Sequence, residues 1–509
     1  MRILFLSMAL LCASLSSFAQ KFQVKWGLEY KKEGGMFSND YLLGSDGKYF
    51  YVLSDPRGKA KVLKFDFTCK LLTATPIAFS TGGKEKAQVG GMLTMKNKTY
   101  LILASRNKKA DIITFYHTEL KNGSFSPTVK SFYSIPFSFN FGSALSLGYG
   151  FASMDATESA DFKKSPGGNV AAIAASGIGV NKEEVIKISV LDENLKVLWE
   201  KPFPLKVSDR NIYIEQYVVN DKGEVFIAAK QWDSKESYKK GLPKYDYKVY
   251  KFTESGMAES TIKLDGDKAP WDAGLFPTPG GGVNLGGFYT KTSTPKGSAD
   301  GVFFSMVDES NKVKSSAYPF TEEFLEGLQT KKQDKKDEGI TRFSIDYLVR
   351  FPDGTYSFIA EKYYITTYTT TDSKGNTTTT TIYHSDEIVV PRFSATGELL
   401  SMAKVEKTFS FRNTPIFTSY SFFVKDNSIV LVYNDFKTKE ERKASGKGRA
   451  IYTDICYVSE NGDVKIDNIF TSKDVEKYYV PGSSVDLGNG KHVVKAIKGK
   501  MYTYGIISL

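Results

Sequence analysis

Four acidic residues and one arginine are spaced along the chain in a way that suggests a shared site, and they are Asp40, Glu215, Asp272, Asp346 and Arg342. Three of these acids precede an acid in a predicted turn by six or seven residues, and the turn acids are Asp46, Asp221 and Asp353. Paired carboxylates about 5 to 9.5 Å apart hydrolyse glycosidic bonds. The alternative, which we favour, is that the acids only hydrate a polar channel.

The other residue types offer little further chemistry. The chain has three histidines, His117, His384 and His492, which lie far apart in the sequence. Because a histidine metal site needs its ligands to converge, we expect no metal. The Gly-x-Ser-x-Gly motif of a serine nucleophile does not occur, and no helix follows Gly280–Gly282 to bind a phosphate. We therefore expect no cofactor.

The elements that would position the acids follow from a repeated turn signal. Dipeptides that favour tight turns recur about every sixty residues between runs of strand-forming residues, at Asp46-Gly47, Lys96-Asn97, Gly167-Gly168, Lys222-Gly223, Gly281-Gly282, Asp353-Gly354, Asp426-Asn427 and Asn489-Gly490. Aromatic residues, which favour strands, make up 14% of the chain. Four short antiparallel strands per repeat predict an all-β propeller.

We expect eight blades, with seven as the alternative. The last repeat has only three predicted strands, and the alternating residues Phe22, Val24, Trp26, Leu28 and Tyr30 supply a fourth. A strand at 22–30 would therefore close a single domain over 20–509. Closure matters because an open array exposes a pairing edge at each end.

Two insertions interrupt the repeat. Residues 321–338 have acids at the start, lysines at the end and Gly339 beyond, which predicts a helix. Residues 363–383 include the Thr-rich stretch Thr366–Thr381, which predicts a hairpin that extends beyond its blade. The alternative for this stretch is a disordered loop.

The N-terminal residues and the composition indicate where the protein is found in the cell. Arg2, an apolar run and Ser17-Phe18-Ala19 predict a signal peptide over residues 1–19 with cleavage after Ala19. A lipoprotein at Cys12 is the alternative. The mature chain has no apolar stretch long enough to span a membrane, and its cysteines, Cys69 and Cys456, are expected to stay unbridged. The net charge of +11 fits exposed lysines better than an anionic partner.

One block of sequence carries a resemblance to known proteins. It contains Phe358–Tyr364 (FIAEKYY), Asp386–Val390 (DEIVV), Gly397–Leu399 and Tyr433–Asp435 (YND). Over about 343–435 the chain resembles a family of uncharacterised secreted β-propeller-like proteins of Bacteroidota. It departs from that family at Lys362 and after Leu400. The resemblance implies export and carries no activity or functional residue.

Taken together, the sequence predicts an exported, non-catalytic binding or scaffold protein of the cell envelope, in the periplasm or at the cell surface. Its partner would be a protein or glycan of the envelope, and we expect no nucleic acid. The alternative is a carbohydrate-active enzyme, a hydrolase or lyase, acting on an acidic glycan through Asp40, Glu215, Asp272, Asp346 and Arg342.

Overall fold

The computed structural model describes residues 24–31, 40–54, 60–77, 88–107, 109–126, 128–136, 162–234, 243–293, 298–329, 339–436, 450–488 and 490–509. The predicted signal peptide, Cys12 and the first strand expected in the third repeat lie outside these ranges. The fold is nearly all β, with 68% of the described residues in strands and 2% in helices. None of the helices in the described ranges is long and apolar enough to cross a membrane.

Antiparallel sheets of four or five strands follow one another along the chain, and we number them in order. Sheet 1 contains β2 (Asp40–Ser45), β3 (Phe50–Ser54), β4 (Lys61–Phe65) and β5 (Leu71–Pro76). Sheet 2 contains β6 (Gln88–Met95), β7 (Lys98–Asn107), β8 (Ile112–Lys121), β9 (Ser124–Phe125) and β10 (Lys130–Pro136). Sheet 3 contains β11 (Lys163–Lys164), β12 (Val170–Ile178), β13 (Glu183–Asp192) and β14 (Val197–Ser208). Sheet 4 contains β15 (Ile212–Val219), β16 (Val225–Gln231), β17 (Asp246–Phe252) and β18 (Met257–Ile262).

The second half of the chain repeats this order. Sheet 5 contains β19 (Lys268–Pro277), β20 (Val283–Lys291), β22 (Gly301–Val307) and β23 (Val313–Pro319), and β21 (Ser298–Ala299) pairs separately with β24 (Ile340–Thr341). Sheet 6 contains β25 (Phe343–Arg350), β26 (Tyr356–Thr371), β27 (Thr377–Phe393), β28 (Leu399–Val405) and β29 (Phe409–Arg412). Sheet 7 contains β30 (Tyr420–Lys425), β31 (Ser428–Asp435), β32 (Tyr452–Val458) and β33 (Val464–Thr471). Sheet 8 contains β34 (Tyr478–Gly488), β35 (Lys491–Lys498), β36 (Met501–Ser508) and β1 (Val24–Lys31).

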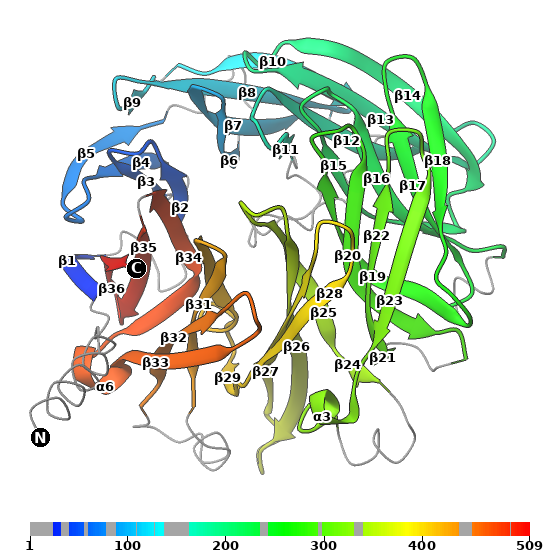
Figure 1. The fold of residues 1–509 in the computed structure, drawn as a ribbon. Helices are drawn as coiled ribbons and strands as arrows, with labels where there is room; N and C mark the ends of the chain where they lie inside the picture. The colour runs from blue at the N-terminus through cyan, green and yellow to red at the C-terminus, as the bar shows by residue number, and fades with distance from the viewer. Residues whose placement is uncertain are drawn as a thin grey trace, which may run out of the picture.

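The sheets surround a central axis (Figure 1), and each apolar core lies mainly between two consecutive sheets. The second strand of a sheet is buried on both faces. In β16, Val225 and Ile227 pack toward sheet 3, while Phe226 and Ala228 pack toward sheet 5. This explains why second strands are runs of continuous apolar residues rather than alternating ones. The arrangement is that of a β-propeller, so the predicted fold class is confirmed, while the number of blades stays a prediction.

The two ends of the described chain share sheet 8. Strand β1 pairs antiparallel with β36, with Val24 opposite Ile507 and Tyr30 opposite Tyr502. Further contacts tie β1 to both neighbouring sheets: the Trp26 ring lies 5.5 Å from that of Phe470, and the Tyr30 hydroxyl donates to the Cys69 carbonyl at 3.0 Å. Sheet 8 in turn packs on sheet 1 through a core that includes Phe50, Phe65 and Tyr504.

The predicted helix over 321–338 is wrong for most of its described part. An α-helix, α3, covers only Glu322–Leu325, with Thr321 as its N-cap. The next residue, Glu326, leaves helical geometry, and Gly327 has a φ of +80°. Leu328 is buried with Phe320 in the core between sheets 5 and 6, so tertiary packing of these apolar residues replaces further helical turns. A second helix, α6, covers Ser472–Val475.

The Thr-rich segment is a regular two-stranded ribbon formed by the ends of β26 and β27 (Figure 1). The two strands stay in register from Tyr363↔Ser385 to Thr371↔Thr377. The turn Asp372–Asn376 closes the ribbon, with the Asp372 carboxylate accepting hydrogen bonds from the N–H groups of Lys374 and Asn376 at 2.9 Å. The side chains from Ile365 to Thr379 are exposed, so this ribbon stands away from the apolar cores.

Candidate functional site: a buried polar network between sheets 4 and 7

β-Bulges in two strands set the direction of two predicted acidic side chains. The first strand of a sheet lines the propeller axis, and in five of the described first strands, namely β2, β6, β15, β19 and β25, one extra residue interrupts the pairing. In two of them the extra residue is a predicted acid: Glu215 in β15, between Ile214 and Gln216, and Asp346 in β25, between Ile345 and Tyr347. A β-bulge redirects a side chain out of the regular alternation. Glu215 and Asp346 therefore occupy positions that a regular strand would not give them.

Glu215 is neutralised by a buried lysine from the next strand. The Lys230 ammonium lies 2.5 Å from the Glu215 carboxylate and also donates to the Trp271 carbonyl of sheet 5. The Tyr247 hydroxyl donates to the same carboxylate. Burial disfavours the charged lysine, but the ion pair with Glu215 outweighs this and holds the pKa of Lys230 above its usual value. The lysine thus joins sheets 4 and 5 at the level of the acid.

Asp272 stands beside this pair on β19. Its Oδ2 accepts a hydrogen bond from the Ile345 N–H of sheet 6 at 2.9 Å. Burial and, next, the negative charge of Glu215 raise the pKa of Asp272 to about 6. Part of the side chain remains exposed. Asp272 therefore links sheets 5 and 6 and can hold or release a proton near neutral pH.

Asp346 continues the network into sheet 7. The Tyr420 hydroxyl of β30 donates to its Oδ2 at 2.7 Å. Burial and the negative charge of Glu361 raise the pKa of Asp346 well above its usual value, and the Tyr420 hydrogen bond offsets part of the rise. The structure therefore brings three of the predicted acids, Glu215, Asp272 and Asp346, into one electrostatic network. These acids come from sheets 4, 5 and 6, and Tyr420 adds sheet 7.

The two other predicted residues, Asp40 and Arg342, make different contacts. Asp40 is buried on β2, where its carbonyl accepts a hydrogen bond from Lys495 of sheet 8 at 2.9 Å. Arg342 is exposed, and its guanidinium lies 4.3 Å from the centre of the Tyr364 ring at the base of the ribbon. Whether Asp40 and Arg342 join the other three acids in one ring of carboxylates stays a prediction. A functional role for the other three stays a prediction.

Sequence reasoning missed a second buried ion pair next to Asp346. Glu361 of β26 and Lys407, which follows β28, form an ion pair and share Ser385 of β27. The Ser385 hydroxyl donates to the Glu361 carboxylate at 2.6 Å. A charged residue within the apolar run Ile359-Ala360-Glu361 was the signal that could have identified Glu361. The position of Lys407 has no comparable sequence signal.

The Tyr433-Asn434-Asp435 segment borders the same ion pair. The Lys407 ammonium lies 5.8 Å from the centre of the Tyr433 ring. The Asp435 carboxylate accepts hydrogen bonds from the N–H groups of Thr408 and Phe436 at 2.7 and 2.8 Å. Burial raises the pKa of Asp435 to about 7, although these hydrogen bonds and Lys407 oppose the rise. Two blocks of the resemblance, around Glu361 and Asp435, thus meet in space.

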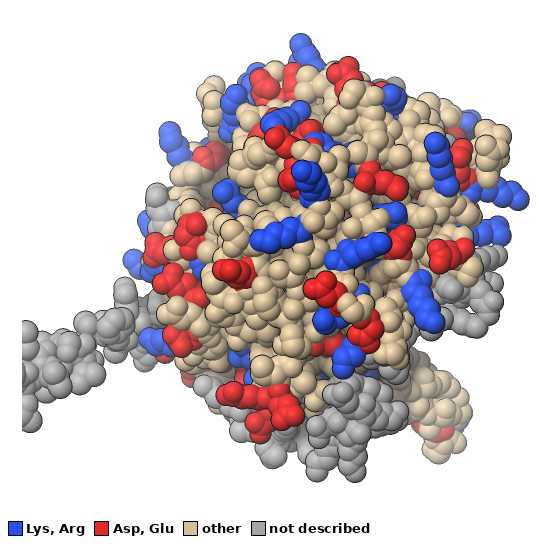
Figure 2. Space-filling view, turned by 45° about the vertical axis from the view of Figure 1, so that its right-hand side comes forward, with Lys and Arg blue, Asp and Glu red and all other residues tan. Residues whose placement is uncertain are grey.

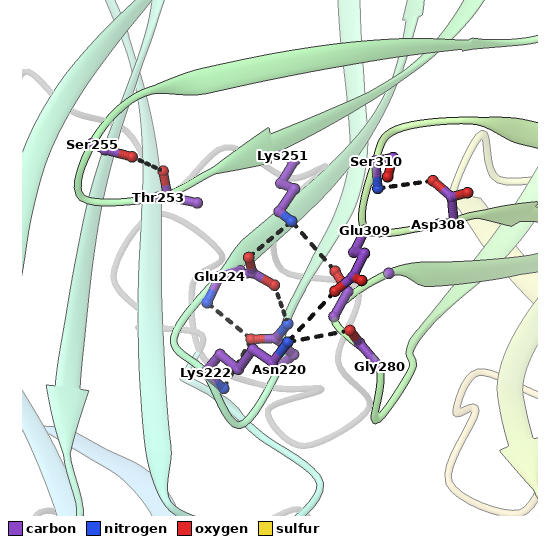
Figure 3. A network of polar contacts seen from close by, with 12 residues as sticks. Asn220, Lys222, Glu224, Lys251, Thr253, Ser255, Gly280, Asp308, Glu309 and Ser310 are labelled. Carbon is purple, nitrogen blue, oxygen red and sulfur yellow. Dashed lines mark hydrogen bonds and ion pairs between the residues drawn. The ribbon is translucent and has the colours of Figure 1, made fainter.

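The far ends of the inner strands carry a more exposed polar contact (Figure 3). Lys251 of β17 lies 2.8 Å from the Glu224 carboxylate. Lys222 donates to the Gly280 carbonyl of sheet 5 at 3.2 Å and lies 3.9 Å from Glu309. Sheets 4 and 5 are therefore joined at both ends, by the buried Lys230 at one and by the exposed Lys222 at the other.

Metal binding finds no support in the described part of the chain, where no three histidine, cysteine or acidic side chains form a cluster suited to an ion. The three histidines pack on different aromatic rings, namely Tyr100, Tyr364 and Phe423. Cys69 and Cys456 are buried and unbridged, as expected. On the face in Figure 2, basic and acidic side chains are interspersed, which fits the interpretation of the net charge as exposed lysines.

The fold and this network define an all-β propeller with a polar belt near its axis. No protein-family model matches the chain, and no curated protein matches it. Among solved structures it is similar to prolyl oligopeptidase B from Galerina marginata, with 8% identity, a TM-score of 0.38, and coverage of 92% of this chain and 55% of that one. It is also similar to a puromycin-hydrolyzing peptidase of Mycobacterium tuberculosis, with 9% identity, a TM-score of 0.37, and coverage of 93% and 61%.

A third similar structure is a protein of unknown function from Dyadobacter fermentans, with 11% identity, a TM-score of 0.32, and coverage of 94% of this chain and 98% of that one. The chain spans 48% of the length of a puromycin hydrolase and 55% of that of prolyl oligopeptidase B. Similarities at these scores say nothing about activity. The resemblance to the Bacteroidota family stays a prediction.

Proposed function

We propose that this protein is an exported, non-catalytic binding or scaffold protein of the cell envelope, in the periplasm or at the cell surface. The observation that carries the proposal is the ribbon of β26 and β27, which presents uncharged residues from Tyr363 to Thr371 on a propeller. A rigid disc with one projecting element is suited to holding a partner. The partner would be a protein or a glycan of the envelope.

The polar network supports this proposal because its two most buried carboxylates are already neutralised. Glu215 is paired with Lys230, and Glu361 is paired with Lys407. A carboxylate whose oxygens are already bound by a buried lysine is not free to contact a substrate. Hydrogen bonds beside the pairs, from Lys230 to the Trp271 carbonyl and from the Ser419 N–H to Ser385, link each pair to the next sheet and stiffen the disc that carries the ribbon.

The test is to replace Thr366–Thr381 by a short Asn-Gly turn and to compare the envelope proteins and glycans that the two chains capture. We expect the ribbon deletion to lose at least one partner that the intact chain retains. A matched control replaces two threonines of the outer strand β5, Thr73 and Thr75, by alanine and keeps every partner. An unchanged set of partners after the deletion would contradict the proposal.

A second candidate function rests on a different observation. Asp272 and Asp346 lie on the inner strands of sheets 5 and 6, both are partly exposed, and both have raised pKa values. A protonated carboxyl beside a second carboxyl is the arrangement that hydrolyses glycosidic bonds. Turnover of acidic glycans that is abolished by Asp346→Asn and reduced by Glu215→Gln would favour this enzyme. Binding without turnover, or turnover that both variants retain, would exclude it.

A further inference from the structure

The outer edge of the ribbon is an unpaired strand edge in the described part of the chain. On its inner side, β26 pairs with β27 as far as Thr371. On its outer side, β25 covers β26 only as far as Lys362, and the Tyr363 N–H then donates to the Arg342 carbonyl at 3.0 Å. Beyond that point no described strand pairs with this edge.

Two hydrogen bonds fix which backbone groups point outward. The Tyr363 N–H points away from β27, toward Arg342, whereas the Asp372 N–H points toward β27 and donates to the Asn376 carbonyl at 3.0 Å. Backbone groups of a strand alternate between its two edges. Both hydrogen bonds therefore give the same outward-pointing set, which consists of Ile365, Thr367, Thr369 and Thr371.

The segment Tyr363–Thr371 has none of the features that usually keep an exposed strand edge from pairing. Exposed strand edges usually carry lysines, prolines or bulges that prevent pairing with another chain. The segment Tyr363–Thr371 contains no charged residue, no proline and no glycine, and it consists of tyrosine, isoleucine and threonine, which favour strands. Its ladder with β27 is regular. The edge is therefore ready to accept one more strand.

The edge is complementary to itself. If two copies pair antiparallel about a twofold axis at Tyr368, the outward groups match as Ile365 with Thr371 and Thr367 with Thr369. The two Tyr368 side chains, each 42% exposed, then face each other across the axis, and cross-strand aromatic pairs stabilise a sheet.

The charges at the two ends of the edge also match. In the same register, Asp372 of one copy lies opposite Tyr364 of the other, and Arg342 covers the Tyr364 ring. The aspartate and the arginine carry opposite charges, and symmetry makes the contact twice. A parallel or shifted register would lose this match.

We propose that two copies of this chain join their ribbons edge to edge through Ile365–Thr371 and form a four-stranded antiparallel sheet between two propellers. This inference deepens the proposed function, because it takes the ribbon as the contact surface and names a second copy as one occupant. Each ribbon edge pairs with its counterpart, so the contact closes after two copies.

The test introduces a single cysteine into the mature chain, either on the proposed twofold axis at Tyr368 or two residues away from it. Tyr368→Cys brings two thiols face to face, at a separation that a disulfide spans. Thr370→Cys is the matched control, because its thiol faces Thr366 of the second copy. Cys69 and Cys456 do not interfere, since both are buried. Under mild oxidation we expect at least ten times more covalent dimer from Tyr368→Cys than from Thr370→Cys.

A second measurement does not depend on cysteine chemistry. The unmodified chain should have the mass of a dimer by light scattering at micromolar concentration. Thr369→Pro removes one outward N–H and should give a monomer with an unchanged circular dichroism spectrum. A monomeric unmodified chain, or equal cross-linking at both cysteine positions, would overturn the inference.

These outcomes separate the inference from the proposed function. A monomer that still loses envelope partners on ribbon deletion would overturn the pairing of two copies and would leave the binding function in place. A dimer whose set of partners does not depend on the ribbon would support the pairing and contradict the proposed function.

Discussion

Glu361 of β26 and Lys407 after β28 form an ion pair whose side chains are 2% and 0% exposed. Ser385 supplies a third polar group, and its hydroxyl also accepts a hydrogen bond from the Ser419 N–H at 2.8 Å. The pair therefore lies where β26, β27 and the entry to sheet 7 meet. Two buried charges at such a junction stabilise it only while both are present.

The first prediction concerns the loss of one member of this pair. Lys407→Met leaves the Glu361 carboxylate buried without a counter-charge, and we expect the free energy of unfolding to fall by about 3 to 5 kcal/mol in urea. Adding Glu361→Leu removes the orphaned charge and should recover most of the loss. If Lys407→Met alone were as stable as the unmodified chain, the Glu361–Lys407 pair would not stabilise this junction.

The second prediction concerns pH and Asp435. Its pKa is about 7 in the folded chain and near 3.8 in the unfolded chain, so the folded state binds the proton more tightly. This contribution to stability is complete below pH 4 and is lost as the pH rises to about 7, with a slope of at most about 1.4 kcal/mol per pH unit.

Asp435→Asn removes this titration. Its free energy of unfolding relative to the unmodified chain should therefore increase between pH 4 and pH 7 and then level off. Asp463→Asn, at an exposed turn of the same sheet, serves as the matched control and should follow the unmodified chain at every pH. A constant difference between Asp435→Asn and the unmodified chain across this range would contradict the prediction.

The sequence predicted the propeller because its turns and strands are local features. Gly47 and Gly354 have φ values of +83° and +84°, so the dipeptides Asp46-Gly47 and Asp353-Gly354 signal turns that the backbone requires. The predicted helix failed over residues 326–329, because a short charged and apolar pattern does not reveal that Leu328 is drawn into a core.

The site was predictable only in part. The spacing of Glu215 and Asp346 before their turns placed both on inner strands, and the structure joins them through Asp272. The lysines that pair with Glu215 and Glu361, Lys230 and Lys407, were not predictable, because a lysine at the end of a strand or in a connection usually faces solvent. Only the packing of adjacent sheets shows that Lys230 and Lys407 do not face solvent.

The third prediction concerns the closure of the ring through β1. Trp26 packs against Phe470 and lies over Gly505 of β36, and it is partly buried. Trp26→Ala should lower the free energy of unfolding by about 2 to 3 kcal/mol, somewhat less than for a fully buried tryptophan. Leu28→Ala in the same strand is 66% exposed and should change stability by less than about 0.5 kcal/mol.

Hydrogen exchange identifies where Trp26→Ala acts. If β1 completes sheet 8, the amides of β36 should exchange faster in this variant, while those of β16 in sheet 4 should keep their protection. Equal loss of protection in both strands would indicate general destabilisation rather than opening at the closure.

The fourth prediction compares the two contacts between sheets 4 and 5. Lys230 is 12% exposed and bridges Glu215 and the Trp271 carbonyl, whereas Lys222 is 56% exposed and reaches Gly280 and Glu309 (Figure 3). Lys230→Met should lower the free energy of unfolding by about 3 to 5 kcal/mol, since it leaves Glu215 unpaired. Lys222→Met should cost less than about 1 kcal/mol, because water screens an exposed pair.

Salt distinguishes the two contacts further. Raising the ionic strength from about 0.01 to 1 M shortens the screening length from about 30 to 3 Å, which weakens surface pairs and leaves buried ones nearly unchanged. The effect of Lys230→Met in urea unfolding should therefore persist at 1 M salt, while any effect of Lys222→Met should vanish. If both effects fell together, the Lys230 pair would be accessible to solvent, and Glu215 would become available for proton transfer, as the enzymatic alternative requires.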